Sequence, residues 1–438
     1  MSRRAPLIEL PVVLTKKPRV PMQQALYAEL RNAMLEGRLQ PGARLPSTRD
    51  LAIQLGIARG TVTLVYEQLR GEGYLASLRG SGTRVAETLP DRWFQEPQHS
   101  AGRAGEGRHR GPRLSAWGKG LRQSPFGDNS RPIARPFRAH IPAVDAFPTE
   151  IWSRLLVHRA RTDERLLLGD GDVRGYAPLR EALAAHLRVA RGVSCTADEV
   201  IIMPSVQRVL DIAARLTLAA GDAVWMEDPG YSGALFVFRA VGARIVPVPV
   251  DADGMNVMRG RELCPDARLA YITPGRQAPL GPTLSMERRL ALLTHAEARR
   301  MLVIEDDYDS EYRYQGRPIP ALAALDRAGL VLHTGTFSKT LLPSLRLSYA
   351  VVREPLLGRF VSAASGLDRF TPPLQQAALA DFITEGHFGR HLRKMRELYA
   401  ERRTALIGEL ARVLPEAEVM GASAGLDLAV RLPSWVND

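Results

Sequence analysis

The sequence of 438 residues has only two cysteines, Cys195 and Cys264, and they lack the spacing of paired metal ligands. This scarcity excludes a disulfide-stapled scaffold, argues against a zinc site and fits the reducing cytoplasm, where we expect the protein to reside. No apolar run approaches the roughly 18 residues of a membrane-spanning helix, so no membrane span is expected. In residues 1–20, Pro6 and Pro11 interrupt the apolar patch and no cleavage site follows, which predicts a tail.

Acidic residues are fewer than basic ones, 47 against 59, and the formal net charge is +12. Such an excess favours an anionic partner, most simply nucleic acid. An arginine-rich background unrelated to binding would give the same charge, so charge alone leaves both interpretations open. The length allows two or three domains, and a composition of 45% hydrophobic and 24% charged residues is typical of a globular protein.

Lysine is rare among the basic residues. The lysines are Lys16, Lys17, Lys119, Lys339 and Lys394. Arginine cannot form a Schiff base with a carbonyl compound, whereas a desolvated lysine amine can. Lys394 lies in the charged helical pattern HLRKMRELYAERR and is expected on a solvated face. Lys339 is therefore the candidate carbonyl-trapping amine, although a lone lysine in a turn is commonly a surface residue.

Two predicted buried strands end in polar residues. Residues 301–304 form an apolar run that ends at Glu305, Asp306 and Asp307. A second run, residues 330–332, ends in the turn Gly-Thr-Phe-Ser-Lys. In open α/β sheets ligands bind at the carboxyl ends of the strands, so we expect both motifs to face one pocket.

The segments EDDYDSEYRY and GTFSKTLLPSLRLSY resemble fold-type I pyridoxal-phosphate enzymes of the aspartate aminotransferase class, in the version carried by the MocR subgroup of GntR regulators. The resemblance implies that Lys339 binds pyridoxal 5'-phosphate (PLP), that Asp306 pairs with its protonated pyridine nitrogen, and that Tyr308 reaches its phenolic oxygen. A carboxylate at the ring nitrogen strengthens the electron sink. The hydroxyls and guanidinium that would hold the phosphate are those of Thr336, Ser338 and Arg346.

From residue 137 onward, helical and strand patterns alternate, which predicts an α/β fold with a mostly parallel sheet. Tyr231, in EDPGY, matches the aromatic residue that stacks on the pyridine ring in the aminotransferase class. An ordinary turn tyrosine is the alternative. Backbone N–H groups of Ser205, Val206 and Gln207, at a predicted helix N-terminus, would meet the phosphate.

Several positions depart from the family pattern. Val206 replaces a small or hydroxyl residue, and Asp170 replaces a tyrosine that reaches the phosphate of the partner subunit. Arg276 and Ala278 replace the histidine and the aromatic or asparagine residue expected there. The sequence stops at Asp438, before the arginine that binds the substrate carboxylate in the family. We therefore expect a truncated small C-terminal domain, weakened cofactor affinity and poor transaminase turnover.

The N-terminal region reads as a winged helix-turn-helix. Helical patterns over residues 23–35, 48–56 and 59–69 include two short helices joined by a turn with glycine. Residues 74–78 and 83–85 alternate around a glycine-rich tip, as in a two-stranded wing. The region from residue 21 to residue 85 closely resembles the GntR-family DNA-binding domain.

A recognition helix places its first side chains in the major groove, so the candidates for DNA contacts there are Arg59, Thr61 and Thr63. The resemblance adds Arg49 as a phosphate or base contact and Gly80 at the wing tip. Alternatively, the two threonines are plain helix surface and Arg49 forms a local ion pair.

The predicted organisation is a tail (1–20), a winged helix-turn-helix (21–87), a flexible linker (88–136) and an aminotransferase-like effector domain (137–438). The resemblance implies a homodimer that binds operator DNA and PLP, with or without a small amine or amino acid effector. We interpret the protein as a PLP-responsive transcription regulator. An active aminotransferase with a regulatory N-terminal domain, or a regulator that no longer binds PLP, are the alternatives.

Overall fold

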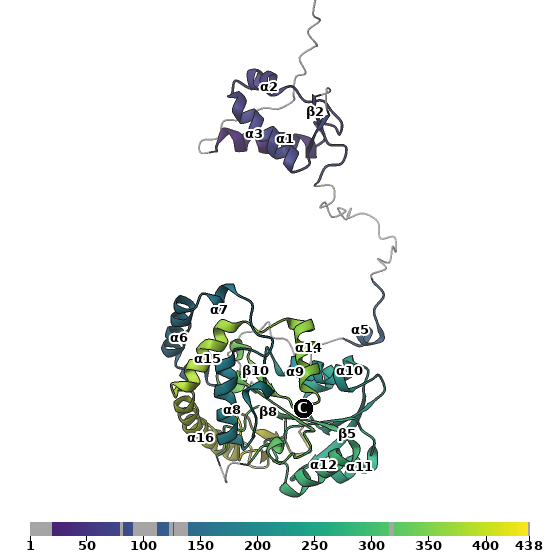
Figure 1. The fold of residues 1–438 in the computed structure, drawn as a ribbon, viewed down its shortest axis with the longest axis vertical. Helices are drawn as coiled ribbons and strands as arrows, with labels where there is room; N and C mark the ends of the chain where they lie inside the picture. The colour runs from purple at the N-terminus through teal and green to yellow at the C-terminus, as the bar shows by residue number, and fades with distance from the viewer. Residues whose placement is uncertain are drawn as a thin grey trace, which may run out of the picture. The chain divides into compact units, whose positions relative to one another are not determined.

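The computed structural model describes residues 20–78, 82–90, 112–121, 126, 139–314 and 319–436. The chain divides into two compact units, residues 1–111 and 112–438 (Figure 1). The predicted tail up to residue 19, the wing tip with Gly80 and most of the predicted linker lie outside the described residues.

The first unit is a three-helix domain with a two-stranded wing. Its elements are α1 (Met22–Leu35), α2 (Thr48–Leu55), α3 (Arg59–Gly71), β1 (Leu75–Leu78) and β2 (Gly82–Val85). The Ser47 hydroxyl accepts a hydrogen bond from the Asp50 N–H, and Gly56 ends the same helix with φ of 63°. Strands β1 and β2 pair antiparallel. The predicted winged helix-turn-helix is confirmed.

The core of the first unit forms where all three helices meet the wing. Leu26 and Leu30 from α1, Leu51 from α2 and Val62 from α3 are fully buried there. The apolar residues recur at helical spacing, so each helix buries one face and leaves the other exposed. Ile53, on the outer side of α2, is 72% exposed.

The second unit is built on one eight-stranded sheet with the strand order β3-β10-β9-β8-β7-β4-β5-β6. The strands are β3 (Val200–Met203), β4 (Ala223–Asp228), β5 (Arg244–Asp251), β6 (Gly254–Met255), β7 (Leu269–Ile272), β8 (Leu302–Asp307), β9 (Val331–Thr336) and β10 (Ser348–Val351). Neighbours from β5 through β4, β7 and β8 to β9 are parallel, while β10 is antiparallel to both β3 and β9. The predicted mostly parallel sheet is confirmed.

Helices cover both faces of this sheet (Figure 1). The helices are α5 (Ala116–Gly120), α6 (Thr149–Thr162), α7 (Arg165–Leu168), α8 (Ala177–Arg191), α9 (Val206–Thr217), α10 (Ser232–Ala240), α11 (Val257–Leu263), α12 (Met286–Arg299), α13 (Phe337–Thr340), α14 (Leu357–Asp368), α15 (Pro373–Thr384) and α16 (His387–Val413). Successive residues of the central strands pack alternately into two hydrophobic cores. Trp225 and Val303 pack with residues of α8, α12 and α15, whereas Met226 and Ile304 pack with residues of α9, α10 and α14.

Two smaller features flank the sheet. Helix α5 lies within the segment predicted as linker, and its Trp117 ring packs edge-on against Phe236 of α10, with centroids 5.5 Å apart. After α16, strands β11 (Glu418–Met420) and β12 (Ala429–Arg431) form an antiparallel pair. The loop between these strands contributes to the site described below. Among the described helices, none combines the length and apolarity that crossing a membrane requires.

Replacing Leu30 with alanine should destabilise the first unit by about 2–5 kcal/mol, because it leaves a cavity in that core. Hydrogen exchange of peptides from residues 21–87, measured on the full chain, reports this loss. The control is Ile53→Ala, which removes an exposed side chain and should change protection little. Equal exchange in the two variants would contradict the burial of Leu30.

Candidate functional site

Asp306 lies at the carboxyl end of β8, where the parallel strands end. The Tyr271 hydroxyl donates a 2.7 Å hydrogen bond to its Oδ2. Its Oδ1 is buried and has no hydrogen-bond partner among the described residues. Burial raises the pKa of this carboxyl to about 6. Asp306 Oδ1 is therefore a buried hydrogen-bond acceptor without a donor among the described residues.

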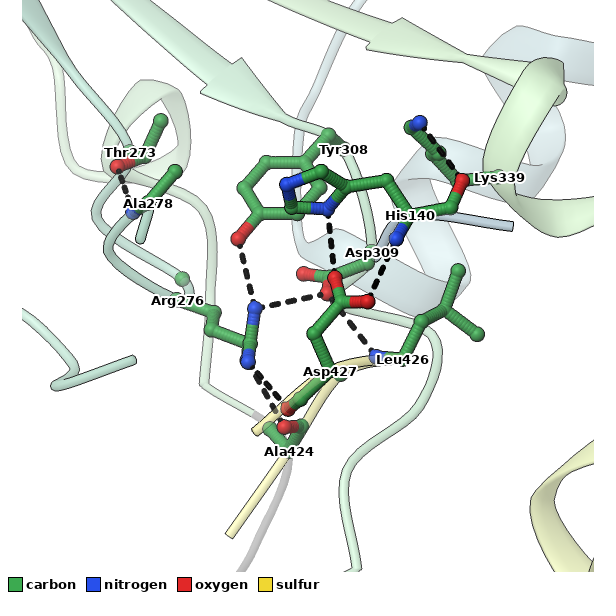
Figure 2. Close-up of polar contacts among 12 residues, drawn as sticks. His140, Thr273, Arg276, Ala278, Tyr308, Asp309, Lys339, Ala424, Leu426 and Asp427 are labelled. Carbon is green, nitrogen blue, oxygen red and sulfur yellow. Dashed lines mark hydrogen bonds and ion pairs between the residues drawn. The ribbon is translucent and has the colours of Figure 1, made fainter. Parts of the chain in front are cut away.

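Lys339 follows the next strand, in the short helix α13 after β9. Its Nζ donates a 2.9 Å hydrogen bond to the carbonyl of His140 (Figure 2). Burial lowers the pKa of the amine, although Asp427, Asp309 and Asp306 oppose that shift. Desolvation therefore favours the neutral, nucleophilic form of the amine.

Tyr308, two residues after Asp306, is held by a buried arginine. Arg276 donates from Nη1 to the Tyr308 hydroxyl at 2.9 Å and lies 3.5 Å from Asp309 Oδ2. It also donates to the carbonyls of Ala424 and Asp427, at 2.9 Å and 2.5 Å. Figure 2 shows this guanidinium between Tyr308 and the loop at residues 424–427. Because the guanidinium donates to the phenolic oxygen, the Tyr308 proton is left for another acceptor.

His140 and Asp427 lie beside Lys339 and are bonded to each other. The backbone N–H of His140 donates to Asp427 Oδ1 at 2.6 Å, and its Nδ1 lies 2.6 Å from Oδ2. His140 has φ of 65°, a conformation that residues with a side chain seldom adopt. This geometry turns the His140 carbonyl toward Lys339 while its ring faces Asp427.

The N-terminus of α9 provides one group of candidate phosphate donors. The Ser205 hydroxyl caps this helix by accepting from the Arg208 N–H at 3.2 Å. Val206 is the first helical residue, and Gln207 donates from its side chain to the Gly233 carbonyl at 3.1 Å. An α-helix leaves its first N–H groups without intrahelical partners, and these attract anions.

A second group of candidate phosphate donors lies on either side of Lys339 in the chain. Thr336 caps α13 by accepting from the Ser338 N–H at 3.1 Å, and the Ser348 hydroxyl donates to the same oxygen at 3.2 Å. The Thr336 and Ser338 hydroxyl protons can still be donated. Arg346 is exposed and has φ of 50° at the end of a 3-10 turn (Pro343–Leu345).

Tyr231 is the residue before α10 and is half-buried. Its ring lies 6.3 Å from that of Tyr271, inclined by 28°. Burial, and then the Asp306 carboxylate, raise the Tyr231 pKa, while Arg346 lowers it. The Tyr231 ring therefore lies beside Tyr271, whose hydroxyl donates to Asp306.

The comparisons with known proteins agree with both units. Residues 150–434 match the family described as aminotransferase class I and II, and residues 22–85 match the bacterial regulatory proteins of the gntR family. The chain is 42% identical to "Probable rhizopine catabolism regulatory protein MocR" of Rhizobium meliloti, over 98% of this chain and 85% of that protein. It is 33% identical to "HTH-type transcriptional regulator TauR" of Rhodobacter capsulatus, over 88% and 78%.

The chain belongs to the GntR family, in the MocR subgroup that carries an aminotransferase class I and II unit. Solved structures support the fold of the second unit. A kynurenine aminotransferase of Pyrococcus horikoshii has a TM-score of 0.64 at 30% identity, over 68% of this chain and 75% of that one. An archaeal alanine:glyoxylate aminotransferase has a TM-score of 0.65 at 29% identity, over 68% and 76%.

The structure shows the surroundings of three residues that depart from the family pattern. Asp170 is 80% exposed and lies 3.7 Å from Arg369. Ala278 is buried, and its N–H donates to the Thr273 hydroxyl at 3.0 Å. Arg276, which sequence reasoning treated only as a substitution, is the hub of the Tyr308 contacts.

Sequence reasoning missed three residues of the site. Tyr271 lies in a fully buried strand pattern, LAYI, in which its hydroxyl gives no signal. His140 and Asp427 are each distant from Lys339 in the chain, and a left-handed backbone at a histidine has no sequence signature. For Asp427 the nearest signal was the glycine in SAGLDLAV, which lets this loop approach Arg276.

The candidate DNA-binding residues of the first unit differ in their exposure and in their hydrogen bonds. Arg49 and Arg59 are exposed, and Arg59 Nε lies 3.4 Å from the Thr48 hydroxyl, which joins α2 to the start of α3. The Thr63 hydroxyl donates to the Arg59 carbonyl at 3.1 Å, a bond within the helix. Thr61 is partly buried. Of these residues, the two arginines have the reach and charge for DNA.

Gly425→Ala should loosen the loop at residues 424–427. This glycine has φ of +86°, and a Cβ would collide with Arg276 and Asp309. We expect a cost of about 1–3 kcal/mol, measured from denaturant unfolding, and faster hydrogen exchange in residues 418–431. The control is Gly408→Ala in α16, where space is open and stability should not fall. Unchanged exchange in Gly425→Ala would contradict the packing of Arg276.

Proposed function

We propose that this protein is a cytoplasmic transcription regulator that binds operator DNA through its first unit and PLP through its second. The observation that supports the cofactor half is Oδ1 of Asp306, which is buried without a hydrogen-bond partner among the described residues and lies at the carboxyl end of the parallel strands, as Lys339 does. A buried acceptor without a donor is costly, and a protonated ring nitrogen would satisfy it.

The surrounding residues fit such a group. Lys339 would bind it covalently, Tyr231 would cover one ring face, and the free proton of Tyr308 would point to its phenolic oxygen. PLP supplies an electron sink for bonds to an amine carbon when it is bound. The phosphate would meet the α9 N-terminus at Ser205, Val206 and Gln207, together with Thr336, Ser338 and Arg346.

The DNA half rests on the exposed start of α3. Ala58 provides no side-chain cap for this helix. The Thr61 N–H donates to the Ala58 carbonyl at 3.1 Å, so the N–H groups of Arg59 and Gly60 are the ones available to phosphates. Arg59 stands at this end and Arg49 on α2. A net charge of +12 adds nonspecific attraction to the polyanion.

Regulation would couple the two halves in a homodimer. Because operators usually present two half-sites, the separation of two DNA-binding units decides affinity. A ligand that binds one conformation of the second unit more tightly shifts the population toward that conformation. We propose that occupancy by PLP, or by PLP with a small amine or amino acid effector, sets that separation.

Lys339→Ala should abolish covalent cofactor attachment. Wild-type protein titrated with PLP should turn yellow and, after borohydride reduction, carry the adduct on the peptide that contains Lys339. Lys394→Ala, which removes an exposed lysine of α16, is the matched control and should keep both properties. An adduct that persists in Lys339→Ala, or a wild type that stays colourless, would overturn the cofactor assignment.

Arg59→Ala should weaken specific operator binding more than binding to random DNA, by about 1–3 kcal/mol for a lost base contact. The matched control is Arg70→Ala, in the last turn of the same helix, which should cost little. Fluorescence anisotropy at several salt concentrations separates the two components. Equal losses on operator and random DNA would make Arg59 a phosphate contact instead.

A further inference from the structure

The wall of the site beside Lys339 is acidic. Asp427 is linked to Lys339 through one residue, because His140 bonds to Asp427 with its N–H and ring and to Lys339 with its carbonyl (Figure 2). Burial raises the Asp427 pKa, but the contacts with His140 outweigh it and lower the pKa below its usual value. Asp427 is therefore ionised at neutral pH.

The buried cation of this region is not available to a ligand. The Arg276 side chain is 1% exposed, and its Nε, Nη1 and Nη2 all donate to protein oxygens. Asp309 lies 3.5 Å from this guanidinium, although burial raises the pKa of its carboxyl to about 7. A ligand carboxylate would have to break these bonds before it could pair with the guanidinium, so Arg276 is a poor carboxylate receptor.

The hydroxyls of Thr336 and Ser338 can donate hydrogen bonds, and they belong to the group proposed for the phosphate. On the Asp427 side of Lys339 the polar atoms accept hydrogen bonds. They include the His140 carbonyl and the Asp427 carboxylate, and the Coulombic influences on Lys339 come from Asp427, Asp309 and Asp306. The Nδ1 of His140 is already directed at Asp427. A ligand carboxylate placed here would meet like charge in a partly desolvated site, whereas hydroxyl or ammonium groups would find acceptors.

We propose that the effector bound beside Lys339 is a primary amine whose other polar groups are hydroxyl or ammonium donors rather than a carboxylate. This inference rests on the proposed function, in which the cofactor, and hence the effector, lies at the carboxyl end of the strands beside Asp306 Oδ1, an atom without a partner among the described residues. It narrows the effector from amines and amino acids in general to carboxylate-free amines.

A matched pair of ligands tests this directly. The PLP-loaded full-length protein is titrated with 4-aminobutan-1-ol and with γ-aminobutyrate, which differ only in a terminal hydroxymethyl or carboxylate group. Binding is followed by the visible spectrum and by calorimetry. We expect the amino alcohol to bind about tenfold more tightly, since the carboxylate meets Asp427. Equal or tighter binding of the amino acid, or no response to either ligand, overturns the inference.

An Asp427 variant tests the effect of this carboxylate independently of the other residues of the site. Asp427→Asn keeps an oxygen that can accept from the His140 N–H but removes the charge, and should bring the two affinities within about twofold. Asp145→Asn, at an exposed ion pair with Arg402, is the control and should keep the preference. An unchanged preference in Asp427→Asn overturns the inference. Failure of the wild type to bind PLP at all would instead defeat the proposed function.

Discussion

The buried carboxylate of Asp306, at the end of a central strand, is only partly satisfied by hydrogen bonds from the described residues. Asp306 receives one hydrogen bond, from Tyr271, and its other oxygen is buried without a donor among the described residues. A buried polar atom left unpaired costs about 1–3 kcal/mol. Its position, at the end of a central parallel strand beside Lys339, is where open α/β sheets bind ligands. Under the proposed function, a protonated ring nitrogen of bound PLP would supply the missing hydrogen bond.

Arg276 connects this position to the C-terminal part of the chain. Its guanidinium joins Tyr308, which follows β8, to the carbonyls of residues 424 and 427. A ligand that moves Tyr308 or Asp427 would therefore disturb the loop between β11 and β12. The candidate site and this loop are therefore joined by direct hydrogen bonds within the second unit.

The fold was largely predictable from sequence, because it follows from local patterns. Buried runs such as VIIM and LAYI, alternating with helical stripes, required a covered parallel sheet, and the Ser47 cap with Gly56 marked α2. Lys339, Asp306 and Tyr308 could be predicted as candidates because they lie at or just after the ends of predicted strands. The contacts of Arg276, His140 and Asp427 could not be predicted. They join segments far apart in the chain and depend on the backbone geometry at His140 and Gly425. Thr63 bonds to its own helix, a choice that sequence alone left open.

The protonation state of the PLP ring nitrogen shows whether this nitrogen donates to Asp306 Oδ1. PLP labelled with ¹⁵N at the ring nitrogen can be bound to the protein and observed by NMR at neutral pH. A ring nitrogen that carries a proton, and loses it in Asp306→Ala, is the result expected if the buried Oδ1 awaits this partner. An unprotonated ring nitrogen in the wild type, or one that Asp306→Ala leaves unchanged, would contradict the account.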